Sequence, residues 1–391
     1  MLNTPFSPWP SFTQEEADAV SRIILSNKVN YWTGTEGREF EKEFATWVGT
    51  AHAIALGNGT LALDLALKAL NVSAGDEVIT TPRTFLASAS SIVTAGAVPV
   101  FADIDLNSQA ITAASIKAVL TPKTKAVIVV HLAGMPAEMD EIMALSEDYG
   151  FFVIEDCAQA HGAKYKGRSV GSIGHVGAWS FCQDKIMTTG GEGGMVTTND
   201  KGLWSSMWSY KDHGKSFDAI YNLEHPPGFR WLHESFGTNW RMTEMQAAIG
   251  RIQLTRMQDW TAKRQANAAM IDNAVSDLSI VRCIEVANYI EHAEYKHYLF
   301  IRPDQLGDGW TRDKIVDAIS AQGVPAFQGS CSEVYLEKAF ENTLWRPVVR
   351  LAGAVELGET SLMFLVHPTL TLAEMDKTCR TISDVLLAAQ G

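Results

Sequence analysis

The sequence of 391 residues has no excess of positive charge and no internal repeat. Asp and Glu outnumber Lys and Arg by 45 to 32, which gives a formal net charge of −13. A field of this sign does not favour nucleic acid or an anionic membrane surface as a partner. Small anionic ligands stay possible, because a few backbone N–H groups can bind a phosphate whatever the total charge.

Cysteine and long apolar runs are also scarce. The five cysteines are odd in number and never spaced as Cys-x-x-Cys, which argues against a disulfide framework or a zinc site. The first residues, MLNTPFSPWPSF, lack the basic and apolar regions of a signal peptide. The longest apolar stretch, at 126–134, is too short to span a bilayer. We therefore expect a cytoplasmic protein without a bound metal.

Strand-like and helix-like segments alternate along the chain. Short apolar runs lie at 51–56, 77–81, 97–104, 126–130, 151–156 and 177–181, and helical patterns at 13–28, 61–70 and 136–150. The helix over 136–150 has Pro at its start and Gly at its end. Continuous apolar runs between helices predict a mostly parallel sheet covered on both faces. In such a sheet, ligands bind beyond the carboxyl ends of the strands.

The second half of the chain has a different pattern. Thr243 and Gln246 form a capping-box pattern that predicts a helix over 243–254, and helical spacing continues towards residue 275. From about residue 280 the segments become short and mixed. We predict a large α/β domain with an N-terminal arm over residues 1–255 and a small α+β domain over 256–391.

Several residues at predicted strand ends could take part in binding or catalysis, and each also has an ordinary structural explanation. Asp156 ends the run FFVIED and is alone best explained as a turn or cap residue. The stretch 57–60, GNGT, fits a phosphate-binding helix start or a simple tight turn. Phe85 follows another strand, where an aromatic residue more often belongs to the core. His161 is treated as structural.

Lys185 follows the last of these strands, close to Ser180 and before the glycine-rich run TTGGEGG. A lone lysine is usually a surface residue, but a lysine at a strand end can act as a reactive amine. Pyridoxal 5′-phosphate (PLP) is the cofactor that suits this set of groups at one sheet edge: a carboxylate, a phosphate-binding turn, an aromatic ring that can stack on the cofactor, and a lysine. In PLP enzymes a lysine bonds to the cofactor and an acid pairs with its pyridine nitrogen.

At this point the sequence resembles the DegT/StrS-type nucleotide-sugar aminotransferases, which are PLP-dependent enzymes of fold type I. The resemblance is strong over roughly residues 10–275 and weak beyond. The matching stretches are NVSAGDEVITTPRTFLASASSIVTAGAVPVFADID, VVHLAGMPAEMDEI, VIEDCAQAHGAKYKG, SFCQDKIMTTGGEGGMV and FGTNWRMTEMQAAIGRIQL. The resemblance implies that fold, with a mostly parallel sheet in the large domain.

The resemblance also implies roles for individual residues. Lys185 matches the catalytic lysine that bonds to PLP, and Asp156 the partner of the pyridine nitrogen. The other implied cofactor contacts are Gln159 and Phe85 against the ring, Gly59, Thr60 and Ser180 at the phosphate, and Asn239 reaching the phosphate from the other subunit of a homodimer. Trp32 and Thr33 match a segment near the sugar substrate.

The implied activity is transfer of an amino group from L-glutamate to a nucleotide-linked keto sugar, for surface polysaccharides such as O-antigens. Lys185 favours this activity, because relatives that act as sugar dehydratases have histidine there. The segment 325–347 matches the family poorly, and we expect it to shape the substrate pocket. The run TTGGEGG is one glycine longer than the common pattern.

Two other classes of protein function remain possible on the sequence alone. A nucleotide-binding oxidoreductase of doubly wound fold requires a glycine-rich fingerprint after the first strand, which GNGT does not supply. A PLP-binding regulator or dehydratase-like relative would bind the cofactor without converting glutamate to 2-oxoglutarate, because fold and cofactor do not fix function.

Overall fold

A seven-stranded sheet forms the centre of the molecule in the computed structural model, which describes residues 4–391. Its order is β1 (His52–Leu56), β9 (Gly194–Thr198), β8 (Val176–Ser180), β5 (Phe152–Asp156), β4 (Thr124–Val130), β2 (Glu77–Thr80) and β3 (Val98–Phe101). Only β9 runs against its neighbours β1 and β8, and the other pairs are parallel. The predicted mostly parallel sheet is confirmed.

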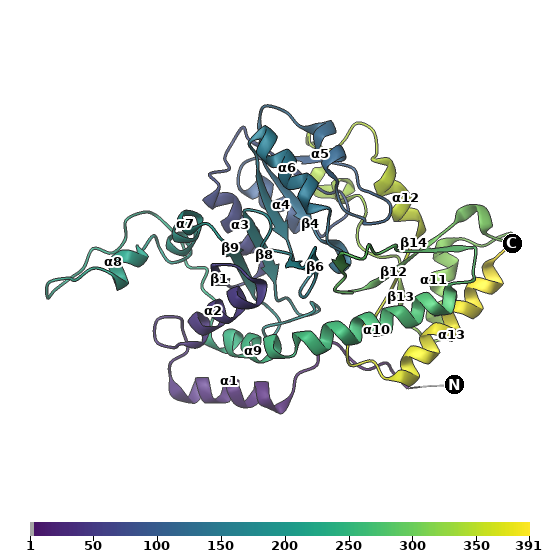
Figure 1. The fold of residues 1–391 in the computed structure, drawn as a ribbon, viewed down its shortest axis with the longest axis horizontal. Coiled ribbons are helices and arrows are strands. Elements are labelled where there is room, and N and C mark those ends of the chain that lie inside the picture. The colour runs from purple at the N-terminus through teal and green to yellow at the C-terminus, as the bar shows by residue number, and fades with distance from the viewer. Residues whose placement is uncertain (1–3) are drawn as a thin grey trace.

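Helices cover both faces of this sheet, as the unbroken apolar runs of its strands require (Figure 1). They are α2 (Glu36–Val48), α3 (Gly59–Ala69), α4 (Ala87–Thr94), α5 (Ala113–Val119), α6 (Met139–Tyr149) and α7 (Lys201–Lys211). The last five residues of β4 are all buried. Helix α6 begins three residues after Pro136, so the predicted start at this proline was wrong.

A second sheet, in the C-terminal part, is antiparallel. Its order is β10 (Val281–Cys283), β12 (His297–Ile301), β14 (Ser361–Phe364) and β13 (Ala326–Phe327). Helices α10 (Met257–Val275), α11 (Arg312–Ala321) and α13 (Leu372–Ala389) pack with it around an apolar cluster of their own. The predicted smaller α+β unit is therefore present, while the division at residue 255 stays a prediction.

Helix α9 (Glu244–Thr255) joins the two parts through α10. Thr243 Oγ1 accepts a hydrogen bond from Gln246 N, and Gln246 Oε1 accepts one from Thr243 N at 2.9 Å. The predicted capping box is thus present. Arg256 separates α9 from α10, which ends at Val275 as the helical spacing indicated.

The smaller elements complete the fold. They are α1 (Gln14–Ser26), α12 (Ala352–Thr360) and a three-stranded sheet of β11 (Ile290–Glu291), β6 (Lys164–Tyr165) and β7 (Arg168–Ser169). Residues 212–240, here called the arm, contain α8 (Phe217–Tyr221) and project from the body beside α7 (Figure 1). No helix within residues 4–391 is long and apolar enough to cross a membrane.

Candidate active site

Asp156 is the last residue of β5 and is held from two directions. Its carboxylate accepts hydrogen bonds from Ala158 N at 3.1 Å and from Ser88 Oγ at 2.9 Å. Burial raises the pKa of Asp156, while these hydrogen bonds and the positive charge of Lys185 oppose the rise. A cationic ligand atom at this carboxylate would offset the cost of burying its charge.

Ser180, the last residue of β8, lies against the start of α3. A Cβ added at Gly59 would come within 2.5 Å of Ser180 Cβ, so only glycine permits this approach. Asn58 caps the helix by accepting a hydrogen bond from Leu61 N at 3.0 Å. The N–H groups of Gly59 and Thr60 stand at the helix start beside the Ser180 hydroxyl, an arrangement suited to phosphate.

The glycine-rich run after Lys185 explains part of this close packing. A Cβ at Gly194 would lie 2.2 Å from the carbonyl oxygen of Asn58, so β9 reaches the phosphate turn only with glycine there. Gly190 and Gly191 have φ values of +85° and +117°, which residues with a side chain rarely adopt. The additional glycine in TTGGEGG therefore belongs to a turn built from two left-handed residues.

Lys185 lies five residues after Ser180, between the central sheet and the C-terminal part of the chain. Trp9 Nε1 donates a hydrogen bond to the carbonyl oxygen of Lys185 at 2.9 Å. Lys185 Nζ lies 5.2 Å from the centre of the Tyr295 ring. The Tyr295 hydroxyl in turn donates a hydrogen bond to Asp184, the residue before the lysine. The backbone and the amine of Lys185 are thus both held by other segments.

Gln159 and Phe85 occupy neighbouring strand ends. Gln159 Oε1 accepts a hydrogen bond from Ala133 N at 2.8 Å, which fixes its side chain near the ends of β4 and β5. Phe85 follows β2 and is 71% exposed, so its ring is not a core residue. Both are placed at the carboxyl edge that carries Asp156 and Ser180, although the contacts of these side chains with a cofactor stay predictions.

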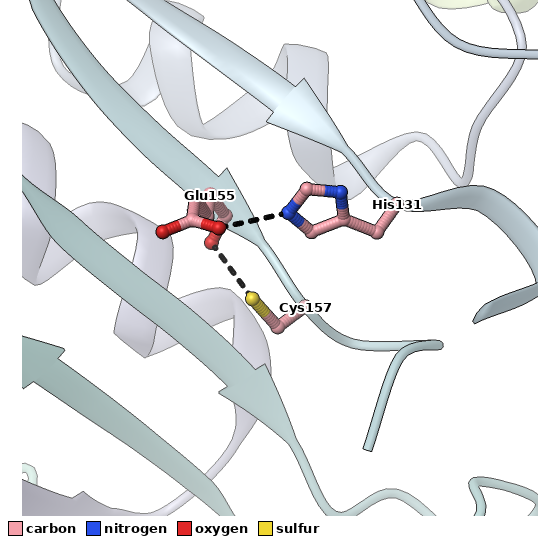
Figure 2. A group of neighbouring side chains, drawn as sticks. All are labelled: His131, Glu155 and Cys157. Atoms are coloured by element: carbon pink, nitrogen blue, oxygen red, sulfur yellow. Dashed lines mark hydrogen bonds and ion pairs between the residues drawn. The ribbon is translucent and has the colours of Figure 1, made fainter. Parts of the chain in front are cut away.

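Beneath this edge, Glu155, His131 and Cys157 form a buried group (Figure 2). Glu155 accepts hydrogen bonds from His131 Nε2 at 3.0 Å and from the backbone N–H groups of residues 171, 173 and 174. His131 Nδ1 accepts one from Ala137 N. Burial raises the pKa of the Cys157 thiol well above its usual value. These bonds already occupy the ligand atoms, so the group joins strand ends and supports Asp156.

His161 also has a structural place. It is fully buried between the rings of Trp179 and Phe181, at centroid distances of 5.2 and 5.6 Å. Burial lowers its pKa to about 3, so the imidazole is neutral. The treatment of His161 as structural agrees with this packing.

The remaining predicted residues lie apart from Lys185. Trp32 is covered by Lys215 of the arm, whose Nζ is 4.3 Å from the centre of the Trp32 ring. Thr33 is exposed beside it, and Asn239 is exposed at the base of the arm. Within residues 4–391, no hydrogen bond, ion pair or ring contact joins these three side chains to Lys185, Asp156 or Ser180.

Sequence reasoning missed the residues that surround Lys185 from the C-terminal part. Tyr295, Lys296 and Arg264 are distant in sequence and match no motif. Asp184 adjoins the lysine and was visible in the sequence, but nothing there indicated that a tyrosine from residue 295 binds it. These contacts depend on how the two parts of the chain pack, which local patterns do not reveal.

The fold and the residues at its sheet edge define a PLP-dependent enzyme of fold type I. Asp156 suits the pyridine nitrogen, the helix start with Ser180 suits the phosphate, and Lys185 offers an amine at the same edge, as the sequence predicts. The sequence profile of the DegT/DnrJ/EryC1/StrS aminotransferase family matches residues 10–383. The chain therefore belongs to this family and is a PLP-dependent aminotransferase.

Similar proteins support this assignment over nearly the whole chain. The spore coat polysaccharide biosynthesis protein SpsC of Bacillus subtilis is 33% identical, with 97% of this chain and 96% of SpsC aligned. A GDP-perosamine synthase of Caulobacter vibrioides is 35% identical, covering 91% and 92% of the two chains. The crystal structure of an aminotransferase from Psychrobacter cryohalolentis is 62% identical with a TM-score of 0.97, over 98% of this chain and 100% of the other.

Proposed function

We propose that this aminotransferase moves an amino group from L-glutamate to a nucleotide-linked keto sugar for surface polysaccharide biosynthesis, including O-antigens. Lys185 carries the proposal, because a free amine beside Asp156 and the phosphate cradle is the group that transamination needs. A GDP-perosamine synthase and a spore coat polysaccharide protein are among the similar proteins. The first supports a nucleotide-linked sugar as the acceptor, and the second supports a place in polysaccharide biosynthesis.

PLP, when bound, would supply an electron-withdrawing ring that makes the proton on the substrate Cα acidic. The Lys185 amine accepts that proton from the donor Cα and returns it on the cofactor side as a general acid. Asp156 would hold the pyridine nitrogen in its charged form, and Ser180, Gly59 and Thr60 would hold the phosphate. Tyr295 and Asp184 limit where the Lys185 side chain can reach.

The acceptor pocket involves the segment 325–347. The carbonyl oxygen of Cys331 accepts a hydrogen bond from Thr84 N at 3.1 Å, and Val334 N donates one to the carbonyl oxygen of Pro82 at 2.8 Å. These bonds place the segment directly beside the strand end that carries Phe85. Its unusual sequence accordingly supports a role in selecting the sugar.

We also propose a homodimer with shared sites, in which Asn239 contacts the phosphate of the partner's cofactor. The arm exposes large apolar side chains that a monomer would leave in water, among them Phe229, Trp231 and Phe236, which are 78%, 84% and 99% exposed. Asn239 lies at the base of this arm, joined by a backbone bridge to Asp212. A second copy of the chain covering the arm would bring Trp32 and Thr33 near the shared site as well.

A cytoplasmic location is consistent with the cysteines. All five are free, and Cys157 is fully buried. Free thiols suit a reducing compartment.

The function is tested by incubating the purified, PLP-loaded protein with L-glutamate and a panel of UDP-, dTDP- and GDP-linked keto sugars. We expect stoichiometric formation of 2-oxoglutarate and an amino sugar nucleotide, measured by mass spectrometry. A protein that binds PLP but forms no 2-oxoglutarate would refute transamination and favour the dehydratase-like or regulatory alternative.

A further inference from the structure

A second lysine lies close to Lys185. Lys296 Nζ is 4.8 Å from the centre of the Tyr295 ring, and Lys185 Nζ is 5.2 Å from the same centre. Both ammonium groups thus approach one aromatic ring, whose hydroxyl is bonded to Asp184. The lysine of the reaction and Lys296 therefore share one small region between the two parts of the chain.

Lys296 directly precedes β12, and the alternation of side chains along this strand indicates the face on which Lys296 lies. Successive strand side chains point to opposite faces. Leu299 and Ile301 belong to the apolar cluster of the C-terminal part, whereas Tyr298 and Phe300 belong to the cluster of the central sheet. Lys296 has the parity of Tyr298 and Phe300, so it faces the space beside Lys185.

The Lys296 ammonium group has no ion-pair partner among the described residues, although acids lie near each cation of this region: Asp184 near Lys296, Asp156 near Lys185 and Glu294 near Arg264. The negative charge of Asp184 acts on Lys296 from a distance. Within residues 4–391, no carboxylate lies within ion-pair distance of the Lys296 amine. Burial, followed by the charges of Arg264 and Lys185 against that of Asp184, lowers the pKa of Lys296 to about 8. A half-buried ammonium group without an acid partner is costly unless an anion binds there.

The guanidinium of Arg264 is a further positive charge near Lys296. It is 1% exposed and donates Nη1 to the carbonyl oxygen of Tyr295 at 3.3 Å. Its Nε and Nη2 atoms have no hydrogen-bond partner among the described residues, and its guanidinium lies 4.9 Å from the centre of a Trp9 ring. Trp9 is also the residue that binds the Lys185 carbonyl. The buried guanidinium thus faces the same region with two unused donors.

We propose that Lys296 binds the α-carboxylate of the amino-acid donor, with Arg264 strengthening the positive field behind it. This inference rests on the proposed aminotransferase function. The α-carboxylate is bonded to the same carbon as the amine that reacts at Lys185, so it must lie within a few bonds of that lysine. The diphosphate of a nucleotide sugar is separated from the keto carbon by the sugar ring and is less suited to this position.

The test compares wild type with Lys296→Gln, Lys296→Arg and the control Lys164→Gln, which removes an exposed lysine paired with Glu291. Binding of 2-oxoglutarate to the PLP-loaded protein is measured by calorimetry, since this keto acid has no amine to transfer. We expect Lys296→Gln to weaken binding about tenfold, the usual effect of losing a charged hydrogen bond. The glutamate concentration for half-maximal deamination should rise equally. Lys296→Arg, which keeps the positive charge, should restore binding relative to Lys296→Gln, and Lys164→Gln should match wild type.

The concentration dependence on the keto sugar nucleotide distinguishes a donor site from a diphosphate site. We expect the half-maximal concentration of the keto sugar nucleotide to be unchanged in Lys296→Gln. An increase in this value without an increase in that of glutamate would overturn the inference. Equal 2-oxoglutarate binding by wild type and Lys296→Gln, with the PLP absorbance of both intact, would also overturn it. A wild type that deaminates glutamate in that experiment keeps the proposed function, so the two failures are distinguishable.

Discussion

Asp156 ends β5 and Lys185 follows the neighbouring strand β8, and single substitutions test the separate roles proposed for them. Replacing Asp156 with Asn keeps the shape but removes the negative charge that the pyridine nitrogen requires. Because a buried charge would then lack its partner, we expect turnover to fall by about 100-fold or more and PLP to bind more weakly. Equilibrium titration with PLP and glutamate deamination measure both effects.

The control for this substitution is Asp140→Asn, which changes an exposed acid paired with Lys166 and Arg168. It should leave PLP binding and turnover at wild-type values. An Asp156→Asn protein as active as the control would contradict the pairing with the pyridine nitrogen.

Lys185→Ala removes the amine while leaving the phosphate cradle intact. We expect the protein to retain PLP without a covalent bond and to lose about 100- to 10,000-fold in turnover, the range for loss of a general acid–base group. Borohydride reduction followed by mass spectrometry should attach PLP to the wild type at Lys185 and not to the variant. Full activity in Lys185→Ala would show that another amine performs the reaction.

At the scale of elements, the junction between α3 and β8 depends on one glycine. An alanine Cβ at Gly59 would lie 2.9 Å from Ser180 Cα, so backbone must shift at the phosphate end of the site. We expect Gly59→Ala to weaken PLP binding about tenfold or more, given the usual cost of overpacking. Gly57→Ala is the matched control, because its Cβ would meet only Leu61 Cδ1 at 3.6 Å and Trp240 O at 4.0 Å. Equal PLP affinities in the two variants would contradict this account of the cradle.

The join between β12 and α10 makes stability depend on pH. Burial would lower the pKa of His297, but Glu294 and Asp272, bonded to its two ring nitrogens at 3.2 and 3.0 Å, raise it to about 10. A raised pKa stabilises the folded state fully below the unfolded value of about 6.5, and the gain is lost as pH rises towards 10. The free energy of unfolding should therefore fall over this interval, by at most about 1.4 kcal/mol per pH unit from this group.

Urea unfolding of wild type and His297→Gln between pH 6.5 and 10 measures this contribution. The variant should be less stable at pH 6.5 and should show a flatter dependence on pH, whereas the exposed His233→Gln should follow wild type. Parallel curves for wild type and His297→Gln would mean that His297 is not charged in the folded protein.

Sequence patterns located six of the seven strands of the central sheet because each of these is a short, mostly apolar run, and they missed β9 (Gly194–Thr198), which directly follows the glycine-rich run. The same patterns placed Asp156, Ser180 and Lys185 at one edge, since parallel strands share a carboxyl end. They could not pair Tyr295 with Asp184 or bring Lys296 to Lys185. Those contacts arise where the C-terminal sheet, through β12, meets the central part of the molecule. The alternation of residues along a strand predicts which face a side chain lies on, but not which residue of another segment it contacts.

The arm illustrates the limit at the scale of the whole molecule. Its aromatic residues look like a core in sequence, yet Trp231 and Phe236 are almost fully exposed in a single chain. Trp32 contacts Lys215 of the arm and Asn239 is bridged to Asp212 at its base, and the described residues show no bond from either side chain to Lys185 of the same chain. A pattern in one chain does not tell whether a residue serves its own site or the site of a second copy.

Mixing two inactive variants tests the shared site directly. If Asn239 completes the partner's phosphate site, Lys185→Ala and Asn239→Asp damage different subunits of each site, the latter by placing a carboxylate beside the phosphate. Co-expression at equal amounts gives half heterodimers, each with one intact site, so about a quarter of wild-type activity should return. Light scattering of the wild type should give the mass of two chains.

The control pair is Lys185→Ala with Gly59→Ala. In the proposed site both residues belong to their own chain, so their heterodimers contain no intact site, and activity should stay low when PLP is kept below the Kd of the Gly59→Ala protein. Recovery with Asn239→Asp but not with Gly59→Ala requires that Asn239 act across the interface. Absence of recovery in both mixtures, with dimers present, would place Asn239 in its own chain's site and leave the arm only a structural role.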